Sequence, residues 1–176
     1  MKNDFTRVEI IEDAKAQGDA VQVFQNFMDK QGKVPEWARV MANRPEILAV
    51  FAKLVGITMG PGLVEQDNKW KMAYKVSKLN NCQYCIGVTE GMMKKLGVSE
   101  EDMQYVLTDI SKMKPDEKVA VEYAEAVTKD AVNLSDQLFE ELKKSYNEAQ
   151  IVELTAVIGL FNYINRFNDA LRVVPE

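Results

Sequence analysis

The chain's only two cysteines, Cys82 and Cys85, are three positions apart, at the start of a segment with helical spacing. This places the two sulfur atoms one turn apart at the amino terminus of a helix. Unpaired amide groups and the positive end of the helix dipole favour a thiolate there, and the thiolate is the reactive form of cysteine. Residues at this spacing also lie within the Cα separation that a disulfide tolerates. The pair could therefore cycle between dithiol and disulfide without unfolding the helix.

Three other interpretations of the pair remain open from the residues alone. A structural disulfide closing so short a loop would stabilise the fold by only about 2 kcal/mol, and such bonds are rare in the cytosol. Two buried thiols could simply fill space as small apolar groups. A metal site needs about four ligands, so it would have to be shared between subunits or completed by carboxylates. Thioredoxin-like proteins carry the same Cys-x-x-Cys spacing, but they need a βαβ context that this sequence lacks. Redox chemistry on a helical scaffold is the favoured hypothesis.

The composition excludes several classes of function. The chain contains no histidine, which removes the commonest general base and metal ligand, together with Ser-His-Asp and Cys-His catalysis. A net charge of −5 argues against a nucleic-acid partner. The longest apolar runs, such as residues 156–161, reach about six residues, far short of the roughly 20 that span a bilayer. Residues 1–5 lack the apolar centre of a signal peptide. We expect a cytoplasmic protein with no membrane partner, no cofactor and no metal.

Helical periodicity dominates the chain, and no strand pattern of convincing length is present. We predict an all-α fold of seven or eight helices in a single domain, residues 1–176. The expected helices cover approximately residues 19–28, 45–55, 65–79, 82–96, 99–110, 115–127, 136–146 and 151–171. The residues expected to begin or end these helices are Asp19, Pro45, Gly97, Ser99, Pro115, Ser135 and Asn147.

The last expected helix, residues 151–171, is apolar on every face. Such a helix must be buried all round, in the core or partly in a subunit interface, so we expect a homo-oligomer. Three polar side chains, Asn162, Asn165 and Arg166, nevertheless share one face of it. Polar groups inside an apolar helix need partners. A role in a pocket and a role in a structural network are both open for these three residues.

Several segments resemble the carboxymuconolactone decarboxylase / alkylhydroperoxidase (AhpD-like) superfamily. Residues 76–86, with sequence VSKLNNCQYCI, resemble its signature, and residues 43–48 and 96–99 resemble the helix starts on either side of it. Residues 161–167, with sequence FNYINRF, resemble a segment of the peroxidase-related branch. The resemblance implies an all-α, oligomeric AhpD-like helical bundle. It also implies thiol peroxidase activity, in which peroxide or an organic hydroperoxide oxidises Cys85 to the sulfenic acid. Cys82 then protonates the leaving group and closes the disulfide, and a dithiol, in some members a lipoyl-bearing adaptor, reduces it.

The sequence departs from this resemblance at the two proton-relay positions. Alkylhydroperoxidases carry a Glu twelve residues before the first cysteine and a His four residues after the second. Those positions hold Trp70 and Thr89 here. Because general acid–base help is typically worth about 10²–10⁴-fold, we expect a slow peroxidase or no peroxidase activity. The helix dipole alone would make Cys82, nearer the helix start, the more acidic thiol, whereas the resemblance assigns the attack to Cys85.

Five residues are candidate auxiliaries to the cysteines: Tyr74, Thr89, Asn162, Asn165 and Arg166. Tyr74 could donate a hydroxyl proton or be a core aromatic. Thr89, on the same helix face as Cys85, could bond the sulfur or its own helix backbone. Glu90 is rotated about 140° from Cys85 around the helix and is a poor relay.

Two other functions stay open: a non-catalytic helical oligomer that binds a ligand or senses oxidants, and, less favoured, a carboxymuconolactone decarboxylase.

Overall fold

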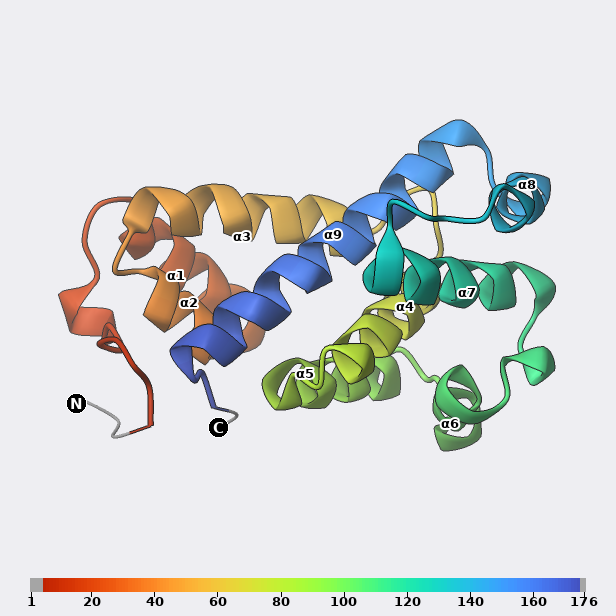
Figure 1. Ribbon diagram of the computed structural model, residues 1–176. Coiled ribbons are helices and arrows are strands. Elements are labelled where there is room, and N and C mark those ends of the chain that lie inside the picture. The colour runs from red at the N-terminus through yellow and green to blue at the C-terminus, as the bar shows by residue number, and fades with distance from the viewer. Residues whose placement is uncertain (1–4, 175–176) are drawn as a thin grey trace. The chain divides into compact units, whose positions relative to one another are not determined.

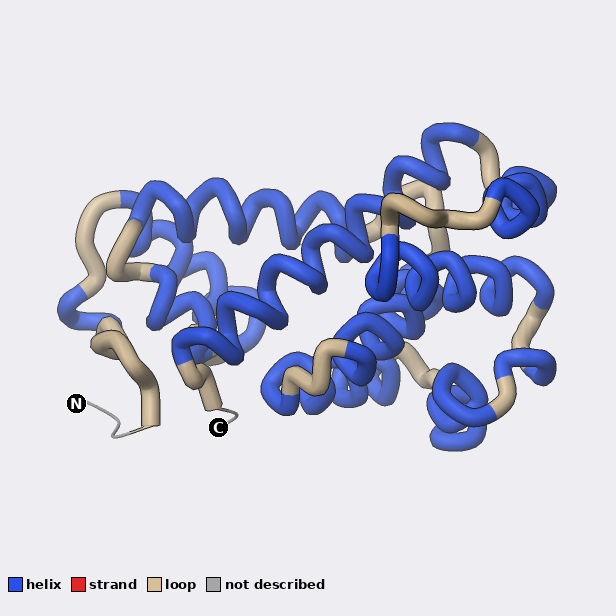
Figure 2. Tube along the Cα trace, in the orientation of Figure 1, coloured by secondary structure: helices blue, strands red, loops and turns tan. Residues whose placement is uncertain are grey.

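The computed structural model describes residues 5–174, and within them every regular element is a helix (Figure 2). Residues 1–4, on which part of the signal-peptide expectation rests, lie outside the described part. Within residues 5–174, nine α-helices and two short 3₁₀ helices follow one another in sequence. The α-helices carry their labels in Figure 1. The α-helices are α1 (Asp19–Gln31), α2 (Glu36–Met41), α3 (Pro45–Met59), α4 (Gln66–Leu79), α5 (Gln83–Lys95), α6 (Glu100–Thr108), α7 (Pro115–Asp130), α8 (Asp136–Ser145) and α9 (Glu148–Leu171). The 3₁₀ helices are η1 (Asp13–Lys15) and η2 (Ile110–Lys112).

The predicted all-α class is confirmed, and eight of the nine α-helices lie at the expected places. The ninth, α2, has six residues, too few for a periodic pattern to show. Ser99 caps α6 by accepting a hydrogen bond from the N–H of Asp102. The prediction that Asp19 caps α1 is wrong, because Gly18 at φ 54° is the capping residue. Asp19 is therefore already helical, in the first turn, where the helix dipole favours an acidic side chain.

The described chain forms two compact units. The first comprises residues 5–57 and 167–174, with α1, α2, nearly all of α3 and the end of α9. Its apolar centre includes Trp37, whose ring meets Phe27 and Phe51 edge-on at 5.6 and 5.4 Å between ring centroids. Edge-to-face contacts of this kind add to the stabilisation from apolar burial. None of the predicted site residues lies in this unit.

The second unit, residues 58–166, is built around α4, which packs against both α5 and α7 (Figure 1). Nine of the 14 residues of α4 are buried, including two lysines. The ammonium group of Lys69, whose side chain is fully buried, lies 2.7 Å from Glu153 of α9 and donates to the carbonyl of Gly60 at 2.6 Å. Glu153 also accepts the N–H of Leu63 at 2.8 Å. These contacts join α9 to residues 60–63 and leave the buried cation paired, as burial of a charge requires.

The last helix, α9, is less buried than its sequence predicts. Its side chains alternate between buried ones, such as Leu154 and Ile158, and exposed ones, such as Val152 and Tyr163. Part of the apolar surface of α9 is therefore exposed within the described residues. Burial in the core thus covers only part of α9 within residues 5–174, and burial of the rest in a subunit interface stays a prediction. Within the same residues, no helix is both long and apolar enough to cross a membrane.

Candidate active site at the junction of two helices

The two cysteines lie where α4 ends and α5 begins. Asn81, between the helices, has a left-handed backbone with φ 57°. Its N–H donates to the carbonyl of Lys78, and the N–H of Cys82 donates to the carbonyl of Ser77, both at 3.1 Å. This pair of bonds forms a Schellman motif, the common way of ending a helix through one left-handed residue. Asparagine tolerates that conformation better than most residues, so the local sequence favours the turn.

Cys82 is the capping residue of α5, with extended backbone angles of φ −80° and ψ 100°. Its carbonyl accepts the first helical hydrogen bond, from the N–H of Ile86 at 2.9 Å. Cys85 is the third residue of the helix. The amide groups of a first turn have no partners inside their own helix, and they carry the positive end of the helix dipole. Both sulfur atoms therefore belong to the end of α5 that stabilises negative charge.

The two thiols are also well shielded from solvent. Cys82 is 0% exposed and Cys85 3% exposed, and both are thiols rather than halves of a disulfide. The neighbouring Tyr84 and Ile86 are each 8% exposed. An oxidant must therefore be small, or the surrounding side chains must move to admit it. Of the two sulfurs, that of Cys85 belongs to the slightly more exposed residue.

Tyr74 and Glu90, which are distant in sequence, are hydrogen-bonded partners. The hydroxyl of Tyr74 on α4 donates to Oε1 of Glu90 on α5 at 3.0 Å. Lys78 lies 3.6 Å from the same carboxylate oxygen and 5.1 Å from the centroid of the Tyr74 ring. Burial, and then the hydrogen bond to Glu90, raise the pKa of Tyr74 above its ordinary value. Tyr74 is therefore a neutral hydroxyl at neutral pH, and its proton is directed to Glu90.

The hydroxyl of Thr89 is bonded to the backbone of its own helix. It donates toward the carbonyls of Cys85 and Ile86, at 2.8 and 2.9 Å, and the residue is fully buried. Bonding of this kind is common for threonine inside helices. Thr89 therefore satisfies the α5 backbone beside Cys85 and holds its proton there.

The polar residues of α9 form a network with the end of α4. Nδ2 of Asn80 donates to Oδ1 of Asn162 at 3.0 Å and to Oδ1 of Asn165 at 2.9 Å. Arg166 donates to the same oxygen of Asn162 at 2.7 Å. Asn165, fully buried, donates in turn to Oγ of Ser77 at 3.3 Å. The structure thus brings Asn162 and Asn165 to the turn that precedes Cys82. Asn80 is not among the predicted site residues, although an asparagine pair at a helix end is a signal for such a turn.

Trp70 occupies the position where alkylhydroperoxidases carry a relay glutamate. It is 7% exposed, and its ring meets Phe161 edge-on at 5.9 Å between ring centroids. Its indole N–H finds no acceptor within the described residues. Trp70 is a core residue, as its sequence context predicts, and it offers no carboxylate to the cysteines.

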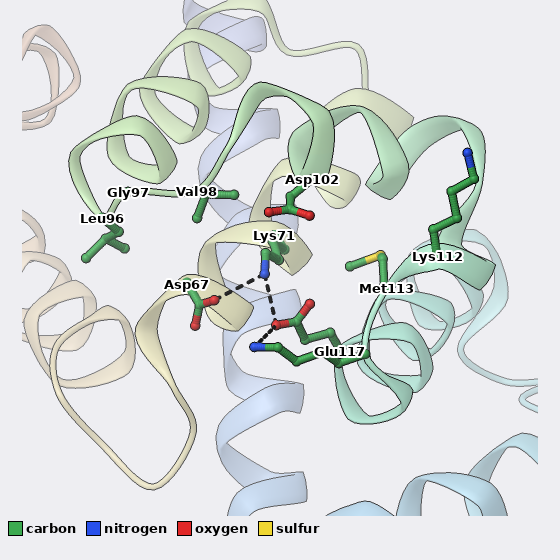
Figure 3. A pocket seen from close by; sticks show the side chains of 10 residues that line it. Asp67, Lys71, Leu96, Gly97, Val98, Asp102, Lys112, Met113 and Glu117 are labelled. Atoms are coloured by element: carbon green, nitrogen blue, oxygen red, sulfur yellow. Dashed lines mark hydrogen bonds and ion pairs between the residues drawn. The ribbon is translucent and has the colours of Figure 1, made fainter.

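A pocket of about 230 Å³ lies elsewhere in the second unit, between α4, α6 and the start of α7 (Figure 3). At its floor Nζ of Lys71 lies 3.1 Å from Asp67 and 3.0 Å from Glu117. Glu117 is also 3.2 Å from Nζ of Lys114. The buried charges of this pocket neutralise one another, and none of the predicted site residues lines it. In the described part of the chain, no three His, Cys, Asp or Glu side chains gather in a way that could hold a metal ion.

Comparison of the sequence with known proteins finds two partial relatives, both uncharacterized. YdfG of Bacillus subtilis (strain 168) is 28% identical over 100 residues, which cover 55% of this chain and 68% of that protein. YnjA of Escherichia coli (strain K12) is 29% identical over 104 residues, covering 58% of this chain and 57% of that protein. No protein-family model matches the sequence.

Solved structures resemble the fold over nearly its whole length. An uncharacterized peroxidase-related protein from Silicibacter sp. TM1040 matches with a TM-score of 0.87 at 20% identity, covering 99% of this chain and 93% of that one. An uncharacterized peroxidase-related protein from Ralstonia eutropha JMP134, described as an alkylhydroperoxidase AhpD core, matches at 0.85 and 19% identity, covering 98% and 93%. The debrominase Bmp8, in complex with 2,3,4-tribromopyrrole, matches at 0.82 and 21% identity, covering 97% and 92%.

Proposed function

Because the chain has the AhpD-like fold of the peroxidase-related proteins, we propose that it is a thiol-dependent peroxidase that uses Cys82 and Cys85. The observation that carries the proposal is the position of the pair: Cys82 caps α5 and Cys85 lies in its first turn. This is where amide groups without helical partners favour a thiolate. The lack of a relay glutamate and histidine, at Trp70 and Thr89, makes the expected reaction slow.

The proposed reaction oxidises the two thiols and reduces one peroxide. The Cys85 thiolate attacks one peroxide oxygen, so that a sulfur–oxygen bond forms while the oxygen–oxygen bond breaks. The departing alkoxide or hydroxide takes the proton of the Cys82 thiol and leaves as alcohol or water. The Cys82 thiolate then attacks the Cys85 sulfenic acid, a disulfide forms, and the hydroxide released is protonated by solvent. A dithiol reductant restores both thiols by disulfide exchange.

The partners follow from the same chemistry. The shielding of both sulfurs favours hydrogen peroxide or a small organic hydroperoxide as oxidant. A dithiol such as a lipoyl group suits the reductant, because it can close its own disulfide after exchange. We also propose a homo-oligomer, supported by the exposed apolar side chain of Val152 on α9. Light scattering at micromolar concentration that shows only a 20.0 kDa monomer would contradict this part of the proposal.

Intact-mass measurement after one equivalent of hydrogen peroxide tests the proposal. The reduced protein is followed over time beside Cys82→Ser, Cys85→Ser and the same chain unfolded in denaturant. We expect the folded wild type to lose two hydrogen atoms faster than the unfolded chain. We expect Cys82→Ser, but not Cys85→Ser, to gain one oxygen atom as a trapped sulfenic acid. The opposite trapping pattern would reverse the roles of the two cysteines, and oxidation no faster than in the unfolded chain would refute the peroxidase.

A second candidate function is reductive debromination, supported by the likeness to the debrominase at a TM-score of 0.82. The same thiol pair would supply the two electrons: an aryl bromide and two thiols would give the dehalogenated ring, a disulfide and hydrogen bromide. Incubation of the reduced protein with 2,3,4-tribromopyrrole separates the two functions. Bromide release that requires both Cys82 and Cys85, with no acceleration of peroxide reduction, would favour the debrominase over the peroxidase.

A further inference from the structure

The turn that carries Cys82 is held by two sets of hydrogen bonds. The first is the backbone Schellman motif, in which the N–H of Cys82 donates to the carbonyl of Ser77 at 3.1 Å. The second consists of side chains and reaches α9, where Asn80 donates to both Asn162 and Asn165. Ser77 takes part in both sets, because its hydroxyl accepts from Asn165 while its carbonyl accepts from Cys82.

The side-chain set extends beyond these three asparagines. Both protons of the Asn80 amide have an acceptor, one on Asn162 and one on Asn165. The amide group of Asn162 donates onward to the carbonyl of Ile158 at 3.1 Å and to Thr128 on α7 at 3.2 Å. The hydroxyl of Ser77 donates to the carbonyl of Ala73 at 2.8 Å. A connected network of this kind, with Ser77 and Asn165 buried at its centre, fixes the position of its members more strongly than separate bonds do.

We propose that Asn80 is a positioning residue for the cysteine pair: it fastens the end of α4 to α9 and so holds Cys82 at the start of α5, within reach of Cys85. This inference rests on the proposed redox function of the pair. Disulfide formation requires a narrow range of Cα separations and dihedral angles. A turn that is fixed by both the backbone and the side-chain hydrogen bonds keeps the Cys82 sulfur in that range. The effective concentration of the Cys82 thiol at Cys85 is therefore high. Asn80 itself touches neither reacting atom in this scheme and acts through the turn.

The reduction potential of the pair tests the proposal without requiring peroxidase activity. Wild type and Asn80→Ala are equilibrated with mixtures of reduced and oxidised glutathione, and the disulfide fraction is measured by alkylation and intact mass. We expect the equilibrium constant for closing the disulfide to fall about tenfold in Asn80→Ala, which for a two-electron couple corresponds to about 30 mV. Asn26→Ala is the matched control, because Asn26 is an exposed asparagine of α1 in the other unit. It should leave the equilibrium unchanged.

Two further variants keep the test decisive. Asn162→Ala removes only one of the two acceptors of the Asn80 amide. It should shift the disulfide equilibrium in the same direction as Asn80→Ala but by a smaller factor, and it keeps the test available if Asn80→Ala fails to fold. In the double variant Asn80→Ala/Asn165→Ala the effects of the two substitutions on the disulfide equilibrium should not add, because both substitutions break the hydrogen bond between Asn80 and Asn165. Folded variants that keep the wild-type equilibrium within twofold would overturn the positioning role. A wild type that forms the disulfide in glutathione but does not reduce peroxide would refute the peroxidase and leave this inference standing.

Discussion

Substitution of Asn81 tests the turn between α4 and α5 directly. At φ 57° this residue is left-handed, a conformation that costs an ordinary L-residue about 1–2 kcal/mol. Glycine adopts it without steric cost but loses more backbone entropy on folding, about 0.5–1 kcal/mol. We therefore expect Asn81→Gly to stay within about 0.5 kcal/mol of the parent, Asn81→Ala to lose about 1 kcal/mol, and the β-branched Asn81→Val to lose about 2 kcal/mol.

The assay combines urea unfolding with the rate of disulfide formation in the folded protein. Because the bond from the N–H of Cys82 to the carbonyl of Ser77 depends on the left-handed residue, a strained turn should misplace Cys82 as well. Disulfide formation should slow in the order Gly, Ala, Val. Gly97→Ala is the matched control: Gly97 ends α5 at φ 81°, and a Cβ there meets nothing within 4 Å. It should lose about 1 kcal/mol of stability without slowing the disulfide.

Two results would refute this reasoning. If Asn81→Val were as stable as the parent, the turn would not be left-handed in solution. If Gly97→Ala slowed the disulfide as much as Asn81→Ala at equal loss of stability, the effect on the cysteines would be a general consequence of destabilisation, and the turn would have no specific role in placing Cys82.

Three further predictions concern α4 and its neighbours. Glu153→Gln should cost about 3–5 kcal/mol in urea unfolding, because it leaves the fully buried ammonium of Lys69 without a counter-charge; a loss below 1 kcal/mol would contradict the pairing. Burial disfavours the Glu153 carboxylate, but Lys69 and backbone N–H groups outweigh it and lower its pKa below the ordinary 4.5. The stabilisation contributed by the ionised Glu153 carboxylate is therefore fully present above about pH 4.5 and is lost as the pH falls through the lowered pKa. The acid unfolding profile of Glu153→Gln should lack this loss of stability. Trp70→Glu, which restores the relay residue of alkylhydroperoxidases, should cost about 3 kcal/mol or more, because it buries an unpaired carboxylate; a stable variant with faster peroxide reduction would show that this position still faces the cysteines. Tyr74→Phe should cost about 1 kcal/mol by removing the bond to the part-exposed Glu90. It should also remove one tyrosine's share of the absorbance change above pH 10 and leave that of Tyr105 and Tyr146, whose pKa values are raised as well; an unchanged spectrophotometric titration would contradict the raised pKa of Tyr74.

The sequence predicts local features well and contacts between distant residues poorly. Ser99, Pro45 and Pro115 begin helices where their chemistry predicts, because capping depends on the next few residues alone. The cysteine pair at a helix start is predictable for the same reason. The pairing of Tyr74 with Glu90 is not predictable from the sequence. The position of Glu90 around α5 does not indicate which residue of α4 it faces.

The asparagine network also shows that local sequence does not identify contacts between distant residues. Helical spacing places Asn162 and Asn165 on one face of α9 and predicts that they need partners. The partner, Asn80, is 82 and 85 residues away along the chain, and only the packing of α4 against α9 identifies it. Local sequence therefore predicts that a polar network exists, and tertiary structure decides what the network holds.

The cysteines experience two opposing influences, and their balance bears on the chemistry. Removal of both side chains from solvent disfavours a pair of thiolates and favours the uncharged disulfide. The first-turn amides of α5 favour one negative charge at the same place. A singly ionised pair, with one thiolate and one thiol, satisfies both influences better than the other dithiol states do. It is also the state that peroxide reduction needs, because the thiolate attacks while the remaining thiol supplies the proton. With Trp70 and Thr89 at the relay positions, the proposed reaction takes this proton from the second thiol, so loss of either cysteine should impair the first chemical step as well as the closure of the disulfide.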